Sequence, residues 1–180
     1  MPHVPQEVDY QDLFSIFEKN PDAPEHRFVD GEDVPEPYRS LLVHEDHMTV
    51  TMEGFYNEPV VLRVVEVARK DNLYARKILL TAGEGGKVTQ FGIMRFNFDY
   101  CTDEVRDEII EGITPLGYIL IKHNLLRRID VHSFLRLQPN DEVAGYFEIE
   151  NAGPTYGRLA TIFCDEKPAV ELLEVASPDV

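Results

Sequence analysis

Arg76 is the residue whose type and surroundings most clearly indicate chemistry. It lies in the run YARKI at positions 74–78. Side chains alternate along a strand, so Arg76 shares a face with Tyr74 and Ile78, an apolar face if Lys77 points to water. A guanidinium buried there needs an anion, and it binds a carboxylate through two parallel hydrogen bonds. That anion is either a ligand or one of the 33 acidic side chains of the chain.

Glu171 is the second residue of interest, because it interrupts the apolar run PAVELL at positions 168–173. Burial raises the pKa of a carboxyl group and suits it to give or accept a proton near neutral pH. The alternative is a glutamate on the solvent face of an edge strand, with Glu174 as an exposed counterpart. The sequence predicts a proton-handling role for Glu171 only if its strand is buried.

Other chemical motifs are weak. The GEGG run at 83–86 lies between two predicted strands, whereas a phosphate-binding loop needs a helix after it, so we interpret it as a hairpin turn. His44 and His47 are two potential metal ligands, too few for a closed zinc site, and a solvated polar cluster is the favoured interpretation. Cys101 and Cys164 have no activating neighbours in sequence, and we expect small buried side chains.

Composition narrows the class of protein. The 180 residues include 17 Lys and Arg against 33 Asp and Glu, a formal net charge of −16, and one compact domain is the default at this length. A field of this sign repels phosphate and anionic lipid, so we expect no nucleic-acid partner and no membrane. The N-terminus lacks the basic start and apolar run of a signal peptide, and the two unpaired cysteines indicate a reducing compartment. The sequence therefore predicts a cytoplasmic protein.

The hydrophobic pattern predicts consecutive strands with segregated helices, which is an α+β fold with a largely antiparallel sheet. Five prolines fall between Pro5 and Pro37, and residues 1–40 are expected to form an irregular arm with short helical patches near 13–17 and 37–43. Thr102 or Asp103 is expected to cap a helix that Gly112 ends, and Pro115 to open another. The expected strands are 60–67, 74–81, 88–98, 129–137, 145–149, 157–164 and 169–175.

Four segments, in order, resemble the chorismate lyase (4-hydroxybenzoate synthetase) family. They are LLVHEDHMT at 41–49, YARKILL at 74–80, TPLG at 114–117, and YGR at 156–158 followed by KPAVEL at 167–172. The resemblance implies an α+β domain over residues 41–180, with helices on one side of the sheet enclosing a ligand pocket. It also implies a lyase without cofactor or metal that converts chorismate to 4-hydroxybenzoate and pyruvate.

The resemblance transfers ligand contacts onto Met48, Arg76, Leu116 and Glu171, with Arg76 and Glu171 as the catalytic pair. Met48 would form an apolar wall, and Leu116 would offer backbone N–H groups at a helix start. Glu171 would polarise the ring hydroxyl or help to protonate the departing oxygen, and the sequence does not choose between these roles.

Two more arginines are candidate substrate contacts. Arg158 matches a family position in the YGR segment. An arginine of the family falls on Ile93 here, and Arg95, two residues along the same strand face, is its possible replacement. Without a second cation, binding of the enolpyruvyl carboxylate of chorismate is in doubt. The segment 138–154 is an insertion that forms either a lid or a surface loop.

The leading hypothesis is therefore a chorismate pyruvate-lyase that serves quinone or related aromatic biosynthesis. The alternatives are a non-catalytic, sensor-like domain that binds an aromatic acid, and a lyase-like enzyme that acts on another carboxylated ring. The sequence leaves the oligomeric state open.

Overall fold

A single seven-stranded sheet forms the centre of the molecule in the computed structural model, which describes residues 7–19 and 22–180. The strand order is β1-β5-β6-β7-β4-β3-β2, and every neighbouring pair is antiparallel. This confirms the predicted α+β class with an antiparallel sheet. The strands are β1 (His26–Val29), β2 (Val60–Lys70), β3 (Leu73–Ala82), β4 (Val88–Asn97), β5 (Arg127–Leu137), β6 (Thr155–Cys164) and β7 (Lys167–Ala176).

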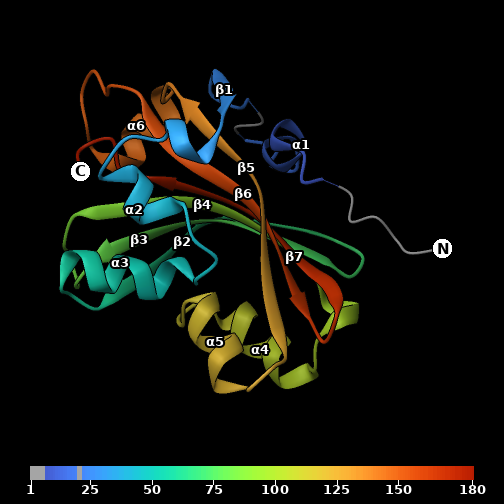
Figure 1. Cartoon of the computed structure of the whole chain (residues 1–180). Helices are drawn as coiled ribbons and strands as arrows, with labels where there is room; N and C mark the ends of the chain where they lie inside the picture. The colour runs from blue at the N-terminus through green and yellow to red at the C-terminus, as the bar shows by residue number, and fades with distance from the viewer. Residues whose placement is uncertain (1–6, 20–21) are drawn as a thin grey trace.

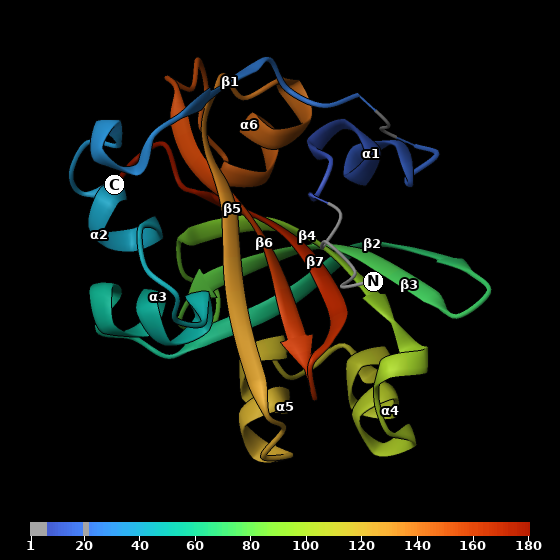
Figure 2. The same ribbon diagram turned by 45° about the vertical axis from the view of Figure 1, so that its right-hand side comes forward.

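Helices cover both faces of this sheet, as Figures 1 and 2 show. The helices are α1 (Tyr10–Ser15), α2 (Tyr38–Leu42), α3 (Met48–Tyr56), α4 (Asp103–Glu111), α5 (Leu116–Lys122) and α6 (Asp141–Phe147), with 3₁₀ turns at Gly31–Asp33 and Phe98–Tyr100. Helices α2 to α5 pack on one face, the predicted arrangement, whereas α1 and α6 pack on the other. None of the helices described is long and apolar enough to cross a membrane.

Local signals in the sequence place several elements as predicted. Thr102 caps α4 by accepting a hydrogen bond from the Val105 N–H, and Gly112 ends the helix at a φ of 72°. Pro115 precedes α5. Gly83 and Gly85 take φ values of 71° and 68° in the turn between β3 and β4, which confirms the predicted hairpin.

The segment 145–149, predicted as a strand, belongs instead to α6 and its C-terminal end. The Asn140 side chain accepts a hydrogen bond from the Val143 N–H and so caps the helix, a signal that the apolar pattern had obscured. Val143 and Phe147, four residues apart, pack into the core beside α1. The 138–154 insertion therefore contributes core side chains on the face away from α2 to α5.

The N-terminal segment is built into the same sheet and core. Leu13 and Phe14 of α1 are fully buried, and β1, within a stretch expected to be coil, pairs with β5. Lys77, expected to face water, is fully buried on the α1 and α6 face, with its Nζ 2.6 Å from a Glu142 carboxylate oxygen. Burial of this cation is compensated by the acid that α6 delivers.

Replacing Phe14 with alanine tests whether α1 belongs to the folding unit. We expect Phe14→Ala to lower the free energy of unfolding by about 3–5 kcal/mol, since it empties a buried site. Phe28→Ala is the matched control, because Phe28 is 59% exposed, and should stay within about 0.5 kcal/mol of the parent. Urea denaturation measures both, and equal small effects would show that α1 contributes little to the core.

Candidate functional site

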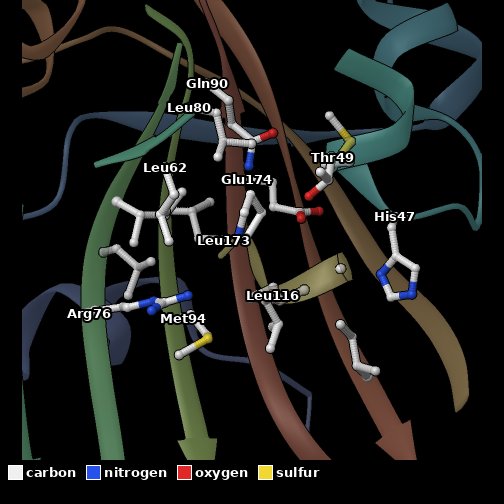
Figure 3. A pocket seen from close by; sticks show the side chains of 18 residues that line it. His47, Thr49, Leu62, Arg76, Leu80, Gln90, Met94, Leu116, Leu173 and Glu174 are labelled. Atoms are coloured by element: carbon white, nitrogen blue, oxygen red, sulfur yellow. The ribbon is translucent and has the colours of Figure 1, made fainter. Parts of the chain in front are cut away.

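A cavity lies between the sheet and the first residues of α3 and α5. Its floor comes from β3, β4 and β7, and its roof from Thr49 and Leu116 (Figure 3). Met48 also lines the cavity. The cavity has a volume of about 60 Å³ for the centres of water-sized spheres. One buried water needs roughly 10–15 Å³ by that measure, so the space fits a small molecule rather than a dinucleotide.

Arg76 lines this cavity from β3 and is 1% exposed. Its Nη1 donates to the Ile109 carbonyl at 2.9 Å, near the C-terminal end of α4, while its Nε has no hydrogen-bond partner. No carboxylate of the described residues lies within ion-pair distance of this guanidinium. Burial accordingly lowers the pKa of Arg76. Arg76 is a buried cation that the protein leaves short of an anion.

Strand register explains how the floor is assembled. Arg76 pairs with Met94 and Met94 with Leu172, so these side chains form a row on one face of the sheet. In the next row, Gly92 lies beside Glu174. A Cβ at Gly92 would approach the Leu173 carbonyl oxygen to 3.1 Å, and its absence keeps the centre of the floor low.

Glu174 and Arg158 form a buried ion pair at the edge of the cavity, with 2.6 Å between Arg158 Nε and a Glu174 oxygen. The Arg158 side chain is fully buried and also donates to the carbonyls of Leu42, His44 and Asp46 at 3.3, 2.7 and 2.9 Å. It thereby fixes the loop that leads into α3. Arg158 has its hydrogen-bonding capacity used by the protein, and its role is to position that loop.

His47 completes the roof as a neutral imidazole. Its Nε2 accepts a hydrogen bond from Arg127 Nε at 3.0 Å, and burial together with Arg127 lowers its pKa to about 4. Gly117 lets α5 approach the start of α3 closely, since a Cβ on Gly117 would lie 3.2 Å from both His47 Cβ and Thr49 Oγ1. Among the described residues that line the cavity, Arg76 therefore carries the positive charge at neutral pH.

A second unpartnered group lies at another point of the wall. Gln90, from β4, is 3% exposed, and its Oε1 has no hydrogen-bond partner. Figure 3 shows it at the opposite end of the floor from Arg76. Such orphaned buried atoms are uncommon in native proteins, and two of them line this one cavity.

The structure brings together only some of the residues predicted from the sequence. Met48, Arg76 and Leu116 line the cavity together. Glu171 and Arg95 lie on the opposite face of the sheet, where they form an ion pair with each other, and Arg95 also binds Asp12 at 2.8 Å. The two charges raise the pKa of Arg95, and their mutual pairing leaves neither group free for the cavity.

The glutamate that reaches the cavity is Glu174, which the alternative interpretation of Glu171 describes as an exposed counterpart. Odd and even residues of β7 point to opposite faces, and β7 is an inner strand with neighbours on both sides. Arg76, Leu172 and Glu174 face the same side of the sheet because of the register in which β3, β4 and β7 pair. No local sequence pattern reveals that register. Gln90 was missed because a glutamine carries no signal of its own in a strand.

The potential metal ligands and the two thiols of the described residues form no further site. Within residues 7–19 and 22–180, no three His, Cys, Asp or Glu side chains cluster in a way that could hold a metal ion. Cys101 and Cys164 are free thiols, and burial raises the pKa of each to about 11. Such thiols remain protonated at neutral pH and are poor nucleophiles.

Comparison with known proteins adds evidence on the fold. No protein-family model matches the sequence, and no curated protein is significantly similar to it. Among solved structures, the effector domain of PhnF from Mycobacterium smegmatis superposes with a TM-score of 0.55 at 9% identity, covering 74% of this chain and 90% of that one. The SA0254 gene product of Staphylococcus aureus gives a TM-score of 0.53 at 12% identity, covering 67% of this chain and 84% of that one.

The ligand-binding domain of a protein described as a GntR-family transcriptional regulator, from Bordetella bronchiseptica, gives a TM-score of 0.51 at 12% identity, covering 67% of this chain and 86% of that one. This chain therefore has the chorismate lyase-like fold found in effector domains of GntR-family regulators. Identities of 9–12% establish that fold and nothing finer.

The His47 environment predicts a pH dependence of stability. The folded pKa of about 4 lies below the ordinary 6.5, so between these values the unfolded chain binds a proton that the folded chain does not. Stability contributed by this site is therefore complete above pH 6.5 and is lost as the pH falls toward 4. We expect urea denaturation of His47→Gln to show a shallower loss than the parent over this range.

The matched control is His26→Gln, at an exposed histidine of β1, which should reproduce the parent slope. If His47→Gln and the parent lose stability in parallel, His47 is not held neutral in the folded protein.

Proposed function

We propose that this chain is a small-molecule-binding domain, without catalytic activity, whose ligand is a small ring-bearing monocarboxylate. The ligand carboxylate binds Arg76, and the ring packs against the apolar wall around Met48 and Leu172. The observation that carries the proposal is the Arg76 guanidinium, buried in the wall of a cavity and without an acidic partner among the described residues.

A buried cation without an anion is costly, and a ligand carboxylate offsets that cost through charge-assisted hydrogen bonds. Nη1 is already bonded to Ile109, so the unpartnered Nε–H is a donor available to the ligand. The apolar side chains around it keep water out and strengthen the interaction.

Charge argues for a monocarboxylate over chorismate. Chorismate is a dianion and needs two cations, but the cavity offers Arg76 alone among the described residues that line it. Arg158 is bonded to Glu174 and to three carbonyls, and Arg95 lies on the other face. The carboxylate of Glu174 would repel a second negative group. The structural neighbours described as effector and ligand-binding domains support the same choice.

A chorismate lyase, or a lyase-like enzyme for another carboxylated ring, is the second candidate. One observation favours it: a carboxylate, Glu174, lines the cavity that also holds Arg76. Glu174 is then the group that polarises a ring hydroxyl or protonates the departing oxygen, the role that the family resemblance assigns to Glu171. No cofactor is required by either candidate.

The proposal extends to location and partners. Two free thiols agree with a reducing cytoplasm. The neighbours include transcriptional regulators, so they do not support the expectation that nucleic acid plays no part in this chain's function. We propose that ligand binding by this domain controls a transcriptional regulatory partner.

Isothermal titration with benzoate tests the role of Arg76. We expect saturable binding to the parent and at least a tenfold loss in Arg76→Ala, because a hydrogen bond to a charged group contributes about 1.5–3 kcal/mol. The matched control is Arg95→Ala, which removes an equal charge from the opposite face and should leave Kd within about twofold. Loss of binding in Arg95→Ala with retention in Arg76→Ala would overturn the assignment.

A direct assay separates the two candidates. Purified protein is incubated with chorismate and a chelator, and 4-hydroxybenzoate and pyruvate are measured against the spontaneous background. The proposal predicts no product above background. Equal amounts of both products, lost in Glu174→Gln, would establish the lyase and contradict a non-catalytic role.

A further inference from the structure

The Gln90 side chain is a polar group that binding of a carboxylate at Arg76 leaves unexplained. It is 97% buried, lines the cavity, and its Oε1 lacks a hydrogen-bond partner. An orphaned buried acceptor destabilises the protein, and a hydrogen bond from a ligand would remove that cost. No contact within the described chain gives this amide oxygen a structural role.

Register places Gln90 at the end of the cavity away from Arg76. Arg76 pairs with Met94, and Gln90 lies four residues before Met94 on β4, on the same face. At ~3.3 Å per residue, the two positions are about 13 Å apart along the strand. A benzoate ring bearing a polar group opposite its carboxylate, with a hydrogen bond at each end, spans a comparable length.

The groups beside Gln90 define which kind of polar group fits. Glu174 lies one row away on the neighbouring strand, between the rows of Arg76 and Gln90, and presents a carboxylate toward the cavity. One of its oxygens accepts from Arg158, which leaves the other as an acceptor. The unpartnered Oε1 of Gln90 and the second oxygen of Glu174 are both acceptors, which favours a ligand that donates.

We infer that Gln90 is a specificity-determining residue that accepts a hydrogen bond from a hydroxyl or amino group on the ring, opposite the ligand carboxylate. This inference rests on the proposed function, because it assumes that the carboxylate binds Arg76. A site built to bond a ligand donor discriminates strongly against an analogue without one, since the buried acceptor is then left unpaired.

The experiment compares four probes that differ only at the para position: benzoate, 4-fluorobenzoate, 4-hydroxybenzoate and 4-aminobenzoate. We expect the parent to bind the hydroxyl and amino compounds about tenfold more tightly than the other two, as one buried hydrogen bond predicts. In Gln90→Leu, of similar size, that preference should fall below about threefold while benzoate binding is retained.

A second measurement uses the unmodified protein and so does not depend on the folding of the variant. The side-chain amide resonances of Gln90 should shift more with saturating 4-hydroxybenzoate than with saturating 4-fluorobenzoate. A shift confined to the donor compounds supports the inference. Equal shifts with both compounds overturn it.

The outcomes separate this inference from the proposed function. If none of the four acids binds, the proposed function fails and the Gln90 assignment falls with it. If all four bind equally, the carboxylate site stands and the role of Gln90 is overturned. If the preference persists in Gln90→Leu, Glu174 is the acceptor and the assignment to Gln90 is wrong.

Discussion

The buried bond network of Arg158 is the interaction on which the cavity depends. This guanidinium joins β6 to Glu174 on β7 and to the backbone carbonyls at 42, 44 and 46. Removing it would leave an acid and a set of carbonyls without donors in the interior, a severe loss for any fold. Because it fixes the loop before α3, it also fixes where Met48 and Thr49 meet the sheet.

Two buried arginines on the cavity face of the sheet differ in how far the protein satisfies them. Arg158 and Arg76 lie on the same face of one sheet, 0% and 1% exposed. The protein supplies Arg158 with a carboxylate and three carbonyls, but supplies Arg76 with one carbonyl, the Tyr74 side chain and no acid among the described residues. In a chain of net charge −16 an acidic partner would be easy to provide, so a guanidinium left without one is most simply explained by a ligand that brings its own.

Sequence reasoning succeeded where the signals are local and failed where they are long-range. Capping by Thr102, termination at Gly112 and the period of the long strands were confirmed because each depends on a few neighbouring residues. The sequence did not reveal that Glu174, and not Glu171, lies on the cavity face, because side-chain parity assigns a face only once β7 is paired with β4 and β6. Lys77 was placed in water because its acid comes from α6, 65 residues away.

Arg76 Nε is the atom on which the account rests, and NMR of the arginine Nε–H groups during a benzoate titration observes it directly. The account predicts that the Arg76 resonance shifts saturably as its unpartnered Nε–H gains a carboxylate, while the Arg95 resonance, already paired with Glu171, stays in place. An unchanged Arg76 resonance at saturating benzoate, or a saturable shift of Arg95 instead, would contradict the proposal that this cavity binds a carboxylate.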